Sequence, residues 1–147
     1  MEHAGSLNPP VAISFSPSAT TWIRLSVIYL IVGVGIGIAM GATHDFTLRP
    51  VHAHVNLLGW TTLALAGLIY AVFPEAGRST LAKIHFWLHN AAQPVMMGSL
   101  ALFLLGNSRA VPVLVASEFV AAAGVIVFAV NVFMNVNIDV AKAAPRR

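Results

Sequence analysis

Four long apolar runs are the feature that most limits how this chain can fold. They cover about residues 21–42, 50–73, 80–105 and 111–136 of the 147-residue sequence. Each run has about the 20 helical residues needed to cross the hydrocarbon core of a bilayer. Only 9% of the residues are charged, whereas soluble domains carry roughly 25%. The sequence therefore predicts an all-α integral membrane protein, because helices satisfy their own backbone hydrogen bonds inside a bilayer.

Short polar segments between the runs predict how the helices are connected. Pro74–Gly77 ends the second run, and Gly106–Arg109 forms a turn between the last two. Short loops join antiparallel neighbours, so we expect an antiparallel four-helix transmembrane bundle over residues 21–137. Residues 1–20 are expected to form an irregular N-terminal tail, and residues 138–147 a basic C-terminal tail.

The basic residues predict the orientation of the bundle. With four spans, one side of the membrane collects Arg24, Arg78, Lys83, Lys142, Arg146 and Arg147, and the other only Arg49 and Arg109. The positive-inside rule then places both termini in the cytoplasm, as in a multi-pass protein of a bacterial inner membrane. These scattered charges indicate topology and a lipid bilayer partner, with no nucleic-acid partner.

Polar side chains at the head of the second run form the first candidate site. Arg49, His52 and His54 lie within two helical turns of the point where the run enters apolar surroundings. Such groups are costly at membrane depth and by default indicate a functional site. His52 and His54 are about 200° apart around a helix, so they face opposite directions. The alternative is an interfacial cap whose polar ends snorkel to the membrane surface.

A second His pair and a carboxylate are the other candidates. His85 and His89 are spaced i, i+4 and share one helix face. Glu118 lies about seven residues into the fourth run, roughly 10 Å deep by the helical rise. Imidazole with carboxylate suits zinc, copper or iron, and without cysteine no thiolate ligand is available. The candidate metal ligands are His52, His54, His85, His89 and Glu118.

The His85–His89 pair and Glu118 also have interpretations in which they only stabilise the fold. The His pair is equally consistent with hydrogen bonds to Asn131 or Asn135, since polar cross-helix contacts hold membrane helices together. Glu118 is equally consistent with a carboxyl group kept neutral by burial, or with one paired to Arg109.

Two motifs resemble a known family. The Arg-Pro-Val-His sequence of residues 49–52, followed by His54, Asn56 and Gly59-Trp60, and the Ile-His-Phe-Trp-Leu-His-Asn sequence of residues 84–90 are similar to the haem-copper oxidase subunit I superfamily. The similarity is closest to its cbb3-type and nitric-oxide-reductase-like branch and to short four-helix relatives. It covers about residues 43–105, two of the four predicted helices.

The resemblance implies a haem b site. In that superfamily an Arg-Pro-x-His element near the start of the second helix supplies an axial ligand to the low-spin b-type haem. Carried over, it makes His52 the first ligand candidate and His54 the second, with Arg49 suited to a haem propionate. His85 and His89 are the further cofactor-binding candidates.

The departures from the family limit the expected activity. Full-length members carry the second haem ligand, the active-site haem ligand and the copper ligands on later helices, and this chain has none of them. It also lacks an adjacent His-His pair of the copper-binding kind. We therefore expect no stand-alone catalysis, because one such chain cannot assemble the oxygen- or nitric-oxide-reducing centre.

The preferred hypothesis is a small haem b-binding membrane protein in electron transfer, gas sensing or haem handling. The alternatives are a membrane protein that handles protons or copper, zinc or iron ions, and a cofactor-free assembly or structural subunit of a respiratory oxidase. We expect a homo-oligomer, because the glycine stripe Gly33, Gly37 and Gly41 and an outward-facing His need something to pack against. A respiratory-chain or oxidase partner is a further expectation of the resemblance.

Overall fold

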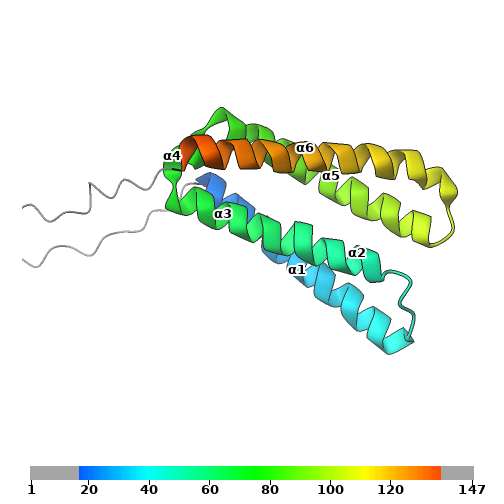
Figure 1. Cartoon of the computed structure of the whole chain (residues 1–147). Coiled ribbons are helices and arrows are strands. Elements are labelled where there is room, and N and C mark those ends of the chain that lie inside the picture. The colour runs from blue at the N-terminus through cyan, green and yellow to red at the C-terminus, as the bar shows by residue number, and fades with distance from the viewer. Residues whose placement is uncertain (1–16, 137–147) are drawn as a thin grey trace, which may run out of the picture.

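The computed structural model describes residues 17–136, and within that range every element of secondary structure is helical. Two long helical hairpins make up the fold: α1 packs along α2, η1 and α3, and α5 packs along α6 (Figure 1). The elements are α1 (Pro17–Thr43), α2 (Arg49–His54), η1 (Val55–Thr61), α3 (Thr62–Val72), α4 (Pro74–Arg78), α5 (Thr80–Leu104), η2 (Ser108–Ala110) and α6 (Val111–Asn135).

The two hairpins converge at one end and diverge at the other. They meet near α4 and separate toward the loops that follow α1 and α5 (Figure 1). Trp22, Leu63 and Tyr70 fill the core at the converged end together with small alanines. A second apolar cluster, which includes Val55, Met96 and other residues of α2, η1, α5 and α6, lies farther along. Packing is therefore tightest at the α4 end.

Local sequence explains where the helices begin and end. Ser79 caps α5, since its side chain accepts a hydrogen bond from the backbone N–H of Ala82. Pro50 stands in the first turn of α2, where its missing N–H costs nothing. Gly106 has a φ of 94°, the left-handed conformation that glycine adopts without strain, and it ends the α5 hairpin arm.

The second apolar run is helical as expected, but its helix is not uniform. Residues Val55–Thr61 form a π-helical segment between α2 and α3. Thr62 supports it by donating its hydroxyl proton to the carbonyl of Leu57, at 2.8 Å. Beyond this run, the predicted stop at Pro74 begins the short helix α4. π-helical turns occur frequently at functional sites.

Three helical stretches are long and apolar enough to cross a membrane: Ala19–Thr43, Arg49–Val72 and Ser108–Asn135. This finding supports a membrane protein. The helix α5 has 25 residues, but His85, His89 and Gln93 lower its hydropathy, and it is not among the three stretches. The first helix begins at Pro17, earlier than the predicted start at about residue 21. Most of the predicted N-terminal tail (residues 1–16) and the predicted C-terminal tail lie outside the described residues.

Candidate functional site

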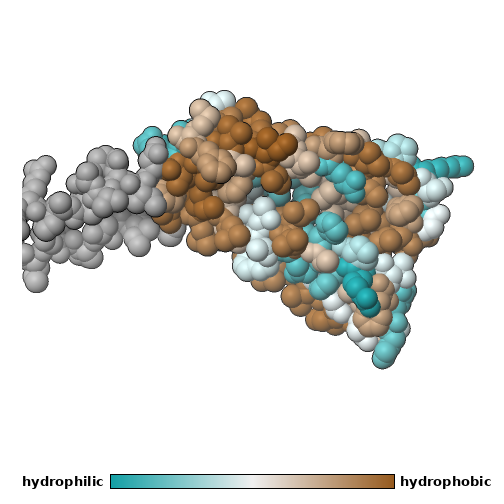
Figure 2. Space-filling view, viewed as in Figure 1, coloured by the Kyte–Doolittle hydropathy of each residue, from teal (hydrophilic) through white to brown (hydrophobic). Residues whose placement is uncertain are grey.

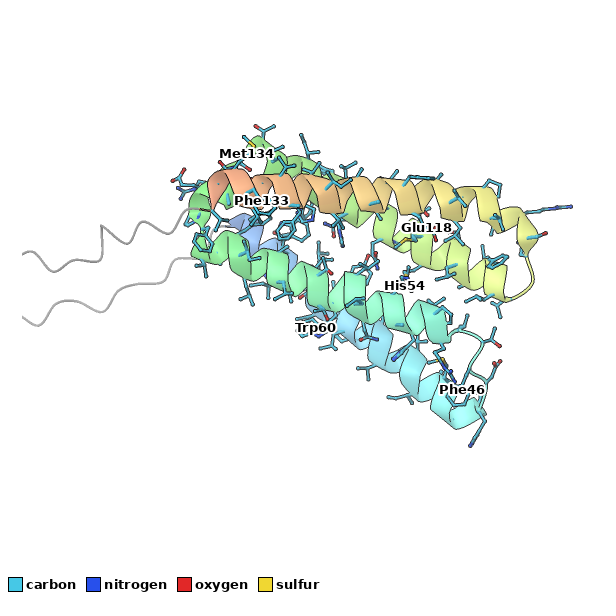
Figure 3. The ribbon with its side chains drawn as sticks, viewed as in Figure 1. Phe46, His54, Trp60, Glu118, Phe133 and Met134 are labelled. Atoms are coloured by element: carbon cyan, nitrogen blue, oxygen red, sulfur yellow. The ribbon has the colours of Figure 1, made fainter. Side chains whose placement is uncertain are left out.

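His52 and His54 lie on opposite sides of α2. The Nδ1 atom of His52 is 2.9 Å from the carbonyl oxygen of Gly33 on α1. A Cβ on Gly37 would lie 2.9 Å from the His52 ring, so this glycine makes room for the imidazole. The Nδ1 atom of His54 is 2.8 Å from the carbonyl oxygen of Pro50, and its exposed ring points toward the space between the hairpins (Figure 3).

These two contacts determine the tautomer of both rings. A carbonyl oxygen only accepts hydrogen bonds, so Nδ1 carries the proton in His52 and in His54. In the neutral form of either ring, Nε2 is then the acceptor. A metal-binding His usually anchors its other ring N–H in this way, which holds the ring and directs the free nitrogen. The helix α2 thus carries two imidazole rings that are held in place, and their Nε2 atoms point in different directions.

His85 is enclosed by aromatic side chains at the converged end. It is 0% exposed. Its ring stacks on Trp22 with a centroid distance of 4.6 Å, and it lies 4.9 Å from the Phe128 ring. The Tyr70 hydroxyl is 3.0 Å from its Nδ1 atom. The structure therefore places His85 in a packed core, away from any opening.

Asn131 completes a polar network behind His85. Its amide N–H group donates to the carbonyl of Ala76 at 3.0 Å and to the Tyr70 hydroxyl at 3.3 Å. Its amide oxygen accepts from Ser79 and from Asn135, both at 2.8 Å. The Tyr70 hydroxyl therefore hydrogen-bonds to both Asn131 and His85. The alternative of a direct His–Asn contact is thus wrong for His85, which reaches Asn131 through Tyr70.

His89 and Gln93 fasten α5 to the main chain of the other hairpin. The Nε2 atom of His89 donates to the carbonyl of Leu58 at 3.0 Å, and the Gln93 amide donates to the carbonyl of His54 at 3.4 Å. Both carbonyls lie around the junction of α2 with the π-helical segment. Within residues 17–136, the Nδ1 atom of His89 and the Oε1 atom of Gln93 are buried and have no hydrogen-bond partner. Both atoms are therefore unused acceptors.

A cleft of about 310 Å³ lies between the hairpins at this level. His54, His89, Gln93 and Glu118 line it together with Leu58, Met96, Ala121, Ala122 and Val125. Figure 2 shows hydrophilic residues gathered where the hairpins face each other, with hydrophobic surface on both sides. His54 and Glu118 lie on opposite sides of this space, on α2 and α6 (Figure 3).

Glu118 corrects one expectation from the sequence. Its side chain is exposed along the cleft, and it forms no ion pair with Arg109 in the described part of the chain. The proposed burial was wrong because α5 covers only one side of α6 and leaves this turn uncovered. Arg49 is also exposed, and its guanidinium group lies 5.3 Å from the centre of the Phe46 ring.

The candidate metal ligands do not converge on one point. Across residues 17–136, no three His, Asp or Glu side chains stand close enough to hold one ion. His52 faces α1 and His85 lies in the aromatic core, while His54, His89 and Glu118 line the same cleft. Sequence reasoning missed Gln93 as a site residue. Its position four residues after His89, on the same helix face, is the signal that would have found it.

Comparison with models of known protein families, with curated proteins and with solved structures finds no match to this chain. The geometry of the described residues therefore carries the functional argument.

Proposed function

We propose that this chain is a haem b-binding protein of a bacterial inner membrane, that it transfers electrons, and that His52 would hold the haem iron. One observation carries the proposal: His52 donates its Nδ1 proton to the Gly33 carbonyl, which leaves its Nε2 lone pair available to iron. The His52 side chain is only partly buried. The bound haem would supply one-electron redox chemistry, and the protein would supply orientation and electrostatics.

The surroundings of His52 suit a planar group. Gly37 lies against the His52 ring, and an added Cβ at Gly41, one turn further along the same face of α1, would meet no atom within 4 Å. Arg49 begins the same helix with an exposed guanidinium group, which pairs well with carboxylates such as haem propionates.

The α5 histidines fit a haem poorly. Aromatic rings enclose His85, and the Nε2 atom of His89 already donates to Leu58. Neither side chain can bind iron through Nε2 without losing packing or a hydrogen bond. We therefore propose His52 as the ligand, with the second ligand coming from another molecule. We infer a homo-oligomer in which a second copy supplies it.

The finer topology belongs to the same proposal. We infer that α5 is the fourth transmembrane helix, because its 25 residues run alongside the apolar α6 for the length of the hairpin. Its polar groups face the other hairpin, and the hydrogen bonds of His89 and Gln93 to main-chain carbonyls lower the cost of placing them there. Both termini then lie in the cytoplasm.

A visible spectrum of the detergent-purified protein from haem-replete cells tests this function. We expect stoichiometric haem b by pyridine haemochrome assay and sharp low-spin bands in the reduced-minus-oxidised spectrum. His52→Ala removes these bands, whereas the matched variant His54→Ala, on the opposite side of α2, keeps them. Far-UV circular dichroism checks that both variants fold. A colourless wild-type protein, or a His52→Ala protein with full haem content, would contradict the proposal.

A further inference from the structure

We propose that the cleft between the hairpins binds a lipid-soluble quinol, an aromatic ring with two hydroxyl groups. The site is defined by Gln93, His89 and Glu118, and it lies on the opposite side of α2 from His52. It goes beyond haem binding and does not depend on it.

The residues that line the cleft carry more hydrogen-bond acceptors than donors. Gln93 is 1% exposed and His89 is 2% exposed. In the part of the chain that the structure describes, Gln93 Oε1 and His89 Nδ1 have no hydrogen-bond partner. The Glu118 carboxylate also only accepts when ionised, and the free Nε2 atom of His54 accepts as well. A buried polar group without a partner is costly. The guest that fits must therefore donate hydrogen bonds.

The arrangement of the acceptors indicates a guest larger than one atom. Because no three ligating side chains in residues 17–136 converge on a point, a single metal ion cannot reach them together. A ring with a hydroxyl group at each end contacts acceptors on two walls of the cleft at the same time. The volume of about 310 Å³ is at the small end of the range for small-molecule sites.

The remaining walls match an aromatic ring. Leu58, Met96 and Val125 present apolar side chains, and two alanines leave room between them. The thioether of Met96 also makes favourable contacts with aromatic rings. Together these residues favour a flat hydrophobic body with polar ends over a hydrated ion.

The position of the cleft indicates that the guest comes from the lipid. Leu58 belongs to the candidate span Arg49–Val72, and Glu118 to the candidate span Ser108–Asn135. The cleft lies between these helices, and hydrophilic residues are seen between the hairpins from the side (Figure 2). A compound dissolved in the bilayer enters from this side. A lipid acyl chain also fits the space, but it carries no donor for the acceptors.

Calorimetric titration of the full chain in phosphatidylcholine nanodiscs tests the proposal. The probes are decylubiquinol, decylubiquinone and the dimethyl ether of decylubiquinol, which share a ring and a tail but differ in donors. We expect saturable binding of the quinol and at least about tenfold weaker binding of the other two, since each lacks the hydroxyl protons. Equal affinity for the quinol and its dimethyl ether, or no saturable quinol binding, overturns the proposal.

Variants locate the site. Glu118→Ala and Gln93→Leu are expected to weaken quinol binding about tenfold each, and Ala122→Phe to abolish it by filling the cleft. Glu75→Ala removes an exposed carboxylate of α4 that does not line the cleft, and it is expected to bind as the wild type does. Identical affinities of Glu118→Ala and Glu75→Ala would overturn the assignment. His52→Ala should lose haem and still bind quinol, so failure of one proposal is distinguishable from failure of the other.

Discussion

The interface between the hairpins has a buried amide side chain toward each end, and the two amides differ in how many hydrogen bonds they make. At the converged end, Asn131 hydrogen-bonds to Tyr70, Ala76, Ser79 and Asn135. At the cleft, Gln93 makes one long hydrogen bond through its nitrogen and, within the described range of residues 17–136, none through its oxygen. Where the hairpins meet, groups from several elements supply the hydrogen-bond partners of Asn131. Where they separate, the amide oxygen of Gln93 has no partner among residues 17–136.

Removing the aromatic centre of the converged end should have the largest effect. Trp22 is 1% exposed and contacts His85, Phe86 and Tyr70. We expect Trp22→Ala to lower the free energy of unfolding by about 3–5 kcal/mol, because it leaves a cavity among rings that cannot close it. Denaturant titration in detergent micelles, followed by far-UV circular dichroism, measures the loss.

The control for this prediction is a tryptophan with little packing. Trp87 is 71% exposed, so Trp87→Ala should change the unfolding free energy by less than about 0.5 kcal/mol. Equal losses for the two variants would show that the converged end is not the stabilising region.

Replacing the two amides sharpens the comparison directly. Asn131→Leu leaves several buried groups without partners, and we expect it to cost about 1–3 kcal/mol. Gln93→Leu removes an oxygen that has no partner and one long hydrogen bond, so its cost should stay below about 1 kcal/mol. The same unfolding titration compares them. A larger loss for Gln93→Leu would mean that the cleft is as fully bonded as the converged end.

The smallest expected effect lies in the loop at the divergent end. Asp45 is exposed, and hydrogen bonds from the hydroxyl and backbone N–H of Thr47 lower the pKa of its carboxyl group. Its contribution to stability is therefore present above the pKa of the unfolded chain and is lost as pH falls through the lower folded value. The difference in melting temperature between the wild type and Asp45→Asn should shrink to zero on acidification. A difference that grows at low pH would contradict this assignment.

Much of the fold was predictable because it depends on local signals. The four apolar runs predicted the four long helical stretches, and Pro50 correctly marked the start of α2. The opposite directions of His52 and His54 followed from helix geometry alone. The π-helical segment was not predicted, since the Asn and Gly within Val55–Thr61 also occur in ordinary α-helices.

The candidate site was also predictable only in part. The sequence pointed to the histidines and to Glu118 because polar groups stand out in apolar runs. It could not show that Glu118 is exposed, nor that Gln93 is unpaired, because both depend on how far apart the hairpins stand. The expected direct contact between His85 and Asn131 was wrong, because Tyr70 lies between the two side chains.

The sequence by itself determined that this is a helical protein with stretches long and apolar enough to cross a membrane, and which of its residues carry polar chemistry. Composition and hydrophobic run length decide these properties, and both are local. Only the tertiary structure decided which nitrogen of each imidazole is free, and which acceptors have no donor. Those properties depend on carbonyls and side chains from other helices, and the angle between the two hairpins sets which of them meet.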